Sequence, residues 1–172
     1  GNWKYEVETD FAESANNAFG GTSIAAVFAK NYEKEPIDES MSPVTDQGHV
    51  ITMKTIQNEM KYDLSEFVVK AGETVTLVFE NNDFMQHNLL ILAEGSMEKV
   101  GAAADKLAQD PNAADSSYIP KMPEVLQSTK LVNPNEKVTL TFTAPSEPGE
   151  YPYVCTFPGH WRIMQGVMKV VR

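Results

Sequence analysis

The chain has 172 residues, a length that suits one domain with a hydrophobic core of ordinary size. Its 24 acidic and 14 basic residues give a formal net charge of −10, which disfavours nucleic acid as a partner because nucleic-acid-binding proteins carry basic patches. One cysteine excludes an internal disulfide, and no apolar run reaches the roughly 20 residues of a transmembrane helix. The chain starts at Gly1 without a signal-peptide pattern, so we expect a mature or trimmed form.

Residues 1–48 are predicted to be an N-terminal extension or linker ahead of the main domain. Apolar and charged residues alternate over 3–8, as in a short strand, and 22–28 has the pattern of a capped amphipathic helix. Residues 33–43 are charged and contain two prolines, which is typical of a linker. We expect this arm to pack on the domain, because its apolar side chains would otherwise be exposed.

Short apolar segments separated by Gly, Pro and Asn turns predict β-strands in the rest of the chain. In 74–80, for example, Val75, Leu77 and Phe79 share one face. Residues 87–92 are mostly apolar, which favours a central strand with both faces covered. The predicted strands are 50–57, 67–70, 74–80, 87–92, 125–132, 137–143, 149–155 and 167–171.

One helix is predicted between these strands, over 96–109. Ser96 stands at its start, Val100 and Leu107 lie on its apolar face, and Pro111 follows its end. About eight short strands with one helical insertion predict an all-β fold, a Greek-key sandwich.

A thiol, an imidazole and a thioether occur within ten residues, at Cys155, His160 and Met164. His87 offers a second imidazole where a polar turn meets an apolar strand. Two His and one Cys with a weak axial Met are the ligands of a mononuclear blue-copper centre. Thiolate and thioether suit Cu(I) and imidazole suits both oxidation states, so this set predicts electron transfer through one type 1 copper ion per chain.

Other interpretations of these residues are open. One Cys and two His also bind zinc, although a structural zinc site normally has a fourth strong ligand and Met is a poor one. Cys155 and Met164 can simply be core residues, as lone Cys and Met commonly are. Gln165 offers an axial oxygen in place of the Met164 sulfur.

The third histidine, His49, is expected to be solvated at the start of the first strand. With three histidines in all, the chain lacks the ligands for the second copper site of multicopper oxidases and copper nitrite reductases. Four protein ligands leave no open position for a substrate, so we expect the protein not to be an enzyme.

The spacing Cys155-x4-His160-x3-Met164 and the run 85–88 resemble the metal loops of the azurin branch of the cupredoxins. The resemblance covers roughly residues 49–172, which it identifies as an azurin-like cupredoxin domain. The sequence after His160 is similar to azurin-like modules of larger multidomain bacterial redox proteins. The chain departs from azurins in lacking their disulfide.

The resemblance also implies roles for residues around the ligands. Asn88 is similar to the residue whose side chain ties the two ligand loops together, with Thr156 in the same brace. Gln86 stands where azurins usually have Gly, at the residue whose carbonyl approaches the metal. The ring edge of His160 is expected near the surface, within an apolar patch for electron transfer. The patch residues are Met85, Phe157, Pro158, Trp161 and Ile163.

Membership in this family would imply a periplasmic or otherwise extracytoplasmic electron carrier, either free or as the redox module of a larger oxidoreductase. Its expected partner is a redox protein or domain, such as a cytochrome or quinoprotein dehydrogenase, bound through a small interface. Two alternatives are a copper storage or delivery protein and a redox-inactive cupredoxin that serves as an interaction module. The lack of Met-rich or His-rich stretches counts against the first, and the intact ligand set against the second.

Overall fold

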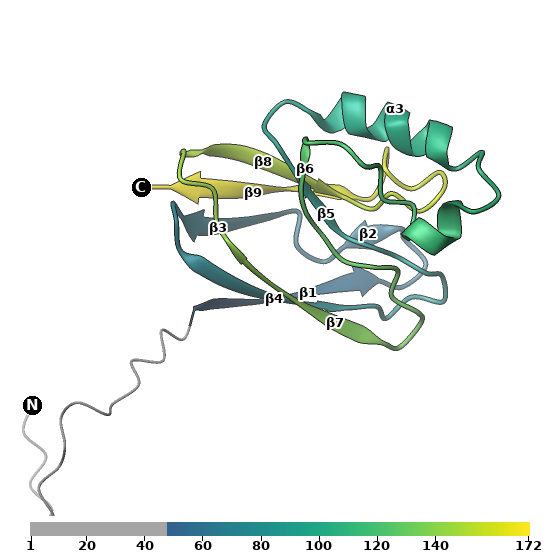
Figure 1. Cartoon of the computed structure of the whole chain (residues 1–172). Helices are drawn as coiled ribbons and strands as arrows, with labels where there is room; N and C mark the ends of the chain where they lie inside the picture. Colours follow the sequence, from purple (N-terminus) through teal and green to yellow (C-terminus); the bar gives the residue numbers. More distant parts are fainter. Residues whose placement is uncertain (1–47) are drawn as a thin grey trace, which may run out of the picture. The chain divides into compact units, whose positions relative to one another are not determined.

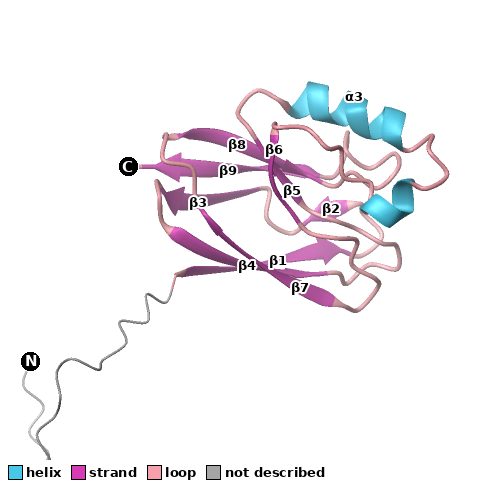
Figure 2. Ribbon diagram, in the orientation of Figure 1, coloured by secondary structure: helices cyan, strands magenta, loops and turns pink. Residues whose placement is uncertain are grey.

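The computed structural model describes residues 48–172, which form two β-sheets packed face to face (Figure 1). The predictions made for residues 1–47 lie outside this range. Figure 2 shows that strands dominate and that the helical residues gather at one end of the sandwich. Among the described residues, no helix combines the length and apolar character that a membrane crossing requires.

Each sheet mixes parallel and antiparallel pairs. The four-stranded sheet has the order β2-β1-β4-β7, with β1 at His49–Ile56, β2 at Lys61–Tyr62, β4 at Thr74–Glu80 and β7 at Lys137–Thr143. The five-stranded sheet has the order β3-β9-β8-β5-β6, with β3 at Glu66–Lys70, β9 at Gln165–Val171, β8 at Gly149–Val154, β5 at Leu90–Leu92 and β6 at Val125–Ser128. Pairs β1–β4 and β3–β9 are parallel and the others antiparallel. The chain crosses repeatedly between the two sheets, so the predicted all-β sandwich is confirmed.

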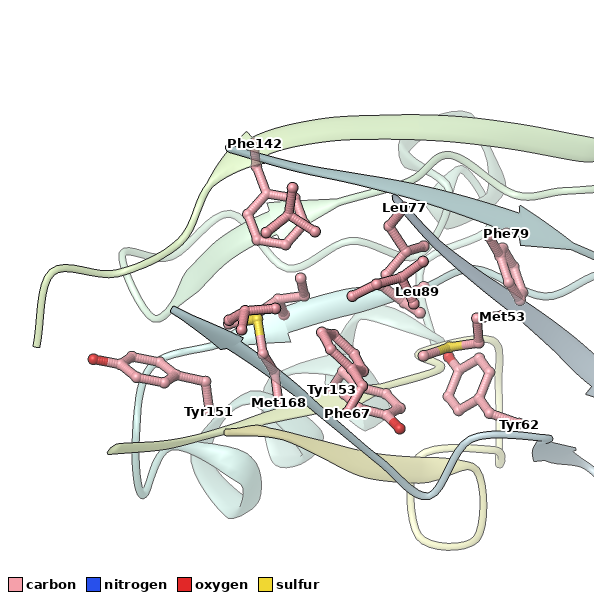
Figure 3. Packing of buried hydrophobic residues seen from close by; sticks show 14 of the residues in the cluster. Met53, Tyr62, Phe67, Leu77, Phe79, Leu89, Phe142, Tyr151, Tyr153 and Met168 are labelled. Atoms are coloured by element: carbon pink, nitrogen blue, oxygen red, sulfur yellow. The ribbon is translucent and has the colours of Figure 1, made fainter. Parts of the chain in front are cut away.

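Alternate side chains of both sheets form the main core between them (Figure 3). In β4, Val75, Leu77 and Phe79 are fully buried, and the residues between them are partly exposed. The ring of Tyr62 packs edge-on against Phe79 and Tyr153, with centroid separations of 5.8 and 5.5 Å. The two-residue period read from the sequence therefore corresponds to one buried face on each of these strands.

β5 is buried on both faces because it lies between two apolar layers. Ile91 belongs to the main core, whereas Leu90 and Leu92 belong to a second cluster. Helix α3 (Met97–Leu107) contributes Val100 to this second cluster, on the outer side of the five-stranded sheet (Figure 1). This arrangement explains the continuous apolar run that predicted a central strand.

Trp161, from the loop after β8, fills the second cluster and fixes that loop against α3. A Cβ added at Gly101 of α3 would lie 2.5 Å from the Trp161 ring, so the ring packs directly on the helix backbone. The indole Nε1 donates a hydrogen bond to Asp105 at 2.9 Å, and the Arg162 guanidinium stacks 4.2 Å above the indole while pairing with the same carboxylate. The helix therefore supports the loop that carries three of the predicted ligands.

Several element boundaries differ from the prediction. The strand expected over 87–92 is regular only in β5, and the one over 125–132 only in β6. Between them, His87 and Val132 form an isolated bridge, and the Thr129 hydroxyl accepts the Leu89 N–H, which interrupts the ladder. β2 and the 3-10 helix η2 (Ala113–Ser116) are not predicted, because such short elements have no periodic pattern.

Replacing Gly101 with Ala should destabilise the domain, although Ala favours a helix interior over Gly by about 1 kcal/mol. The added methyl group would overlap the Trp161 ring, which Asp105 holds in place. We expect overpacking to lower the free energy of unfolding by about 1–3 kcal/mol, measured by denaturant unfolding followed by circular dichroism. The exposed Ala102→Gly change is the control for helix propensity alone; a Gly101→Ala protein more stable than wild type would contradict this packing.

Candidate metal centre

The loop between β8 and β9, residues 155–164, is folded by its own backbone hydrogen bonds. The Cys155 N–H donates to the Met164 carbonyl at 3.0 Å, and the Met164 N–H donates to the His160 carbonyl at 2.8 Å. Gly159 has φ of +84°, a conformation that favours glycine. These contacts turn the loop back on itself, and Cys155, His160 and Met164 are all buried.

His87 reaches the same place from the segment before β5. The register of β5 with β8 pairs Leu90 with Val154, so the segment before β5 and the segment after β8 leave the sheet side by side. The bridge to Val132, with its N–H donating to the His87 carbonyl at 2.8 Å, fixes the His87 backbone on the other side. The His87 backbone is therefore placed by the pairing of β5 with β8 on one side and by the isolated bridge to Val132 on the other.

Three donor atoms from these segments converge. The Cys155 Sγ lies 3.7 Å from Nδ1 of His87 and 3.6 Å from Nδ1 of His160, and the two imidazole centroids are 5.0 Å apart. Ligand atoms of all three residues lie within 4.8 Å of one another. At 0, 0 and 2% exposure for His87, Cys155 and His160, they form a buried group that can hold one metal ion.

Burial makes the metal-free thiol a weak acid. It raises the pKa of Cys155 to about 12, although the backbone N–H groups of Asn88 and Phe157 act in the opposite direction. A thiolate is the form that binds a metal, and a bound cation deprotonates a coordinating thiol. Loading the site therefore requires the Cys155 proton to leave.

The two imidazoles are neutral near pH 7. Burial, with a smaller contribution from the neighbouring His87, lowers the pKa of His160 to about 4, although Asp83 acts in the opposite direction. Burial also lowers the pKa of His87, although Asp83 opposes this. Neutral imidazole is the form that ligates metals, so both rings are already in the required protonation state.

Met164 and Gln165, the two candidates for an axial ligand, lie in different environments. Met164 is completely buried in the same core cluster as Cys155. Gln165 is exposed, and its Nε2 donates to the Arg162 carbonyl at 3.0 Å. A side chain turned to the surface is poorly placed to ligate a buried ion, which favours Met164.

Asn88 connects the two segments that carry the predicted ligands. Its Oδ1 accepts the Thr156 N–H at 2.8 Å, and its Nδ2 donates to the Thr156 hydroxyl at 2.9 Å and to the Ser117 carbonyl at 2.7 Å. The side chain is fully buried, with these polar atoms paired. The structure thus brings Asn88 and Thr156 together, whereas the side chain of Gln86 is turned toward Asn133 at 2.7 Å.

Asp83 is a residue of the site that the sequence interpretation missed, because it lies in the polar segment before the strand predicted at 87–92. Its Oδ2 lies 3.0 Å from Nε2 of His87, and its Oδ1 accepts the N–H groups of Asn58 and Phe84. Burial alone would raise the pKa of Asp83, but these three N–H donors hold it below its usual range. The spacing of Asp83 and His87, four residues apart, is the only sequence signal of the pair.

The residues predicted for the apolar patch are not equally exposed. Ile163 is 50% exposed, and Met85, Phe157 and Pro158 are half-buried. Trp161 lies in the core beneath α3 rather than on the surface, because its ring fills the second cluster. His160 itself is nearly buried, and its ring contacts that of Phe157 at a centroid distance of 4.9 Å.

A two-layer mixed sandwich with a buried His-Cys-His group in the loops at one end is the architecture of a cupredoxin. Comparison with known families agrees, because residues 49–171 match the model described as copper binding proteins, plastocyanin/azurin family. The chain belongs to the plastocyanin/azurin family of copper-binding proteins.

Individual relatives support the same assignment. The chain is 40% identical to auracyanin-A of Chloroflexus aurantiacus over 114 residues, which is 65% of this chain and 68% of that protein. It is 33% identical to an azurin of Achromobacter denitrificans over 123 residues, 64% of this chain and 77% of that protein. It is thus similar both to an auracyanin and to an azurin.

Solved structures of similar proteins include two auracyanins. Dithionite-reduced auracyanin from Roseiflexus castenholzii has a TM-score of 0.63 and 34% identity, covering 72% of this chain and 97% of that one. Auracyanin A of Chloroflexus aurantiacus, described as a "blue" copper protein, has a TM-score of 0.63 and 36% identity, covering 71% of this chain and 98% of that one.

The donor set fits the copper that this family binds. One thiol and two imidazoles, with a buried thioether nearby, combine soft and intermediate donors, which suit both oxidation states of copper. No carboxylate belongs to the group, so it lacks the hard oxygen ligands of a magnesium or calcium site.

Copper binding should release about one proton per ion at pH 7, because the Cys155 thiol is protonated and both histidines are neutral there. Isothermal titration calorimetry of the metal-free protein with Cu(II), in two buffers of different ionisation enthalpy, measures this number. The affinity should fall about tenfold for each pH unit below 7 while the histidines stay neutral. Release of no proton would show that the thiol is already ionised, and release of two that one histidine is protonated.

Proposed function

We propose that the chain transfers single electrons through one type 1 copper ion bound by His87, Cys155, His160 and Met164. The observation that carries this proposal is the convergence of a thiol and two imidazole nitrogens, with the Sγ 3.6–3.7 Å from both nitrogens, among buried residues of a cupredoxin fold. Copper bound there would supply a one-electron couple between Cu(II) and Cu(I).

The surroundings of the ligands support electron transfer rather than enzymatic catalysis. The loop hydrogen bonds, the Asn88 brace and the Asp83 contact hold the donor atoms before any ion binds. A site that is built in advance changes little between oxidation states, which favours rapid electron exchange. With four protein ligands, no position would be left for a substrate.

Electrons would enter and leave near His160. Its ring contacts the half-buried Phe157, whose ring in turn packs edge-on against Tyr118 at 5.5 Å. Exposed Ile163 lies in the same loop. Apolar side chains over a redox ligand suit small, short-lived interfaces with partner proteins.

The partner is proposed to be another redox protein or domain, such as a cytochrome or quinoprotein dehydrogenase. A formal charge of −10 would attract a partner with a positively charged docking face and speed its association. An extracytoplasmic location is proposed from the relatives, which include Neisseria meningitidis outer membrane protein H.8, 36% identical over 89 residues, 51% of this chain and 45% of that protein.

The burial of the ligands counts against copper storage or delivery. Delivery needs ligands that a second protein can reach and replace, whereas His87 and Cys155 are fully buried and His160 is 2% exposed. The complete donor group likewise counts against a redox-inactive interaction module.

Replacing Cys155 with Ala should abolish the blue colour and leave a folded sandwich, because the apolar core does not depend on the metal. The test is a Cu(II) titration of the metal-free protein followed by visible absorption and electron paramagnetic resonance. Wild type should show intense red-light absorption and narrow copper hyperfine splitting that saturate at about one copper per chain. His49→Ala is the matched histidine control, since His49 is exposed and paired with Glu73, and it should keep the full colour. Blue absorption that survives in the Cys155→Ala protein would refute the assignment.

Replacing Met164 with Leu should keep the colour and raise the reduction potential, because a weak axial donor to Cu(II) is lost. Leu keeps the volume of the buried side chain, so the fold should be little affected. Voltammetry measures the potential, and Gln165→Ala, at the exposed neighbouring position, should leave it unchanged. A shift in the Gln165 variant instead of the Met164 variant would reverse the axial assignment.

A further inference from the structure

His87 contacts a buried carboxylate on the side of its ring opposite Cys155. The Asp83 Oδ2 lies 3.0 Å from Nε2, whereas Nδ1 lies 3.7 Å from the Cys155 Sγ. Exposure is 0% for His87 and 2% for Asp83, so water does not compete for this contact. An ionised carboxylate only accepts hydrogen bonds, so Nε2 carries the ring proton and Nδ1 presents its lone pair toward Cys155.

The Asp83 carboxylate is itself held in place by backbone donors. Its Oδ1 accepts the Asn58 N–H at 3.1 Å and the Phe84 N–H at 2.9 Å. The Asp83 N–H donates to the Thr55 hydroxyl and to the Asn81 side-chain oxygen, both at 3.0 Å. Contacts from β1, the turn after it and the loop before β5 thus fix one carboxylate against one imidazole.

No lysine or arginine of residues 48–172 balances this charge. Among these residues, the basic side chain that contacts Asp83 is His87 alone, and its ring is neutral near pH 7. In a buried site, a unit charge is weakly screened and acts strongly on another charge nearby. A negative charge attached to a copper ligand stabilises the more positive oxidation state of the ion.

We propose that Asp83 is a positioning residue of the copper site, which holds His87 with its proton on Nε2 and favours Cu(II) over Cu(I) through its negative charge. A neutral acceptor at this position would orient the ring without contributing a full charge. Hydrogen-bond partners behind metal ligands typically change metal affinity by about 10–100-fold. This inference rests on the proposed copper function, but its first test does not need copper.

The first test is made on the metal-free wild-type protein. Long-range 1H–15N correlation spectra of the imidazole rings distinguish the two neutral tautomers of a histidine. We expect His87 to be in the Nε2–H form, with a ring N–H that exchanges slowly with water because it is buried against Asp83. A His87 ring protonated on Nδ1 would overturn the positioning role, whatever the site binds.

The second test compares the copper-loaded Asp83→Asn protein with wild type. The amide would keep its oxygen toward Asn58 and Phe84 and would turn its NH₂ toward the protonated Nε2, so that the bond and the charge are both lost. We expect preference for Cu(I) over Cu(II) to rise at least tenfold, which is about 59 mV in the one-electron reduction potential. A potential equal to that of wild type would overturn the electrostatic role.

The matched control is Glu73→Gln, which removes the same charge from another carboxylate–histidine pair. Glu73 lies 3.0 Å from the exposed His49 in the turn between β3 and β4, at the far end of β3 and β9 from the ligand loop. The reduction potential of the Glu73→Gln protein should stay at the wild-type value. An equal shift in both variants would mean that the change in potential follows from net charge alone, and it would overturn the role of Asp83. If wild type shows no blue site, the proposed function fails, while the tautomer result still decides whether Asp83 positions His87.

Discussion

The antiparallel pairing of β5 with β8 is the constraint on which the rest of the site depends. Its register sets Leu90 opposite Val154, and the same register continued beyond the ladder sets Asn88 opposite Thr156. The Asn88 side chain makes two hydrogen bonds to Thr156, one to its backbone N–H and one to its hydroxyl, and these extend the pairing after the strands have ended. His87 is one residue further from the ladder than Asn88, and Cys155 is one residue nearer to it than Thr156. This pairing brings Nδ1 of His87 to 3.7 Å from the Cys155 Sγ, although the two residues are 68 positions apart in the sequence. A shift by one residue would turn one ligand away from the other.

Burial gives this arrangement its chemical character. The same low-polarity surroundings keep the Cys155 thiol protonated and both imidazoles neutral, so the metal-free site contains no net charge on its three donors. An uncharged group of donors tolerates burial without a counter-ion, which allows the sandwich to fold before a metal arrives. A metal ion held by these three residues would displace the proton of the Cys155 thiol.

Two different kinds of contact hold the two ligand segments from outside. The loop after β8 is held by packing, through Trp161 on the Gly101 backbone and the Asp105 hydrogen bond. The His87 segment is held by polar contacts, through Asp83, Asn81 and the bridge to Val132. Helix α3 therefore serves the site although it contributes no ligand, and so does the turn after β1.

The sequence by itself determined the sandwich and the donor types. Alternating burial in β1, β4, β7 and β9 follows the two-residue apolar period. Cys155, His160 and Met164 are close in sequence, so their local spacing was enough to predict them as ligands. Tertiary structure alone decided what depends on contacts between distant segments. The strand predicted at His87 is shorter than expected, and Trp161 lies in the core instead of the surface patch. The Gln165 side chain lies at the surface, and Asp83 contacts His87. Periodicity reports which face of a strand is buried, but the partner of a buried polar group is fixed by the register between strands, which no local pattern records.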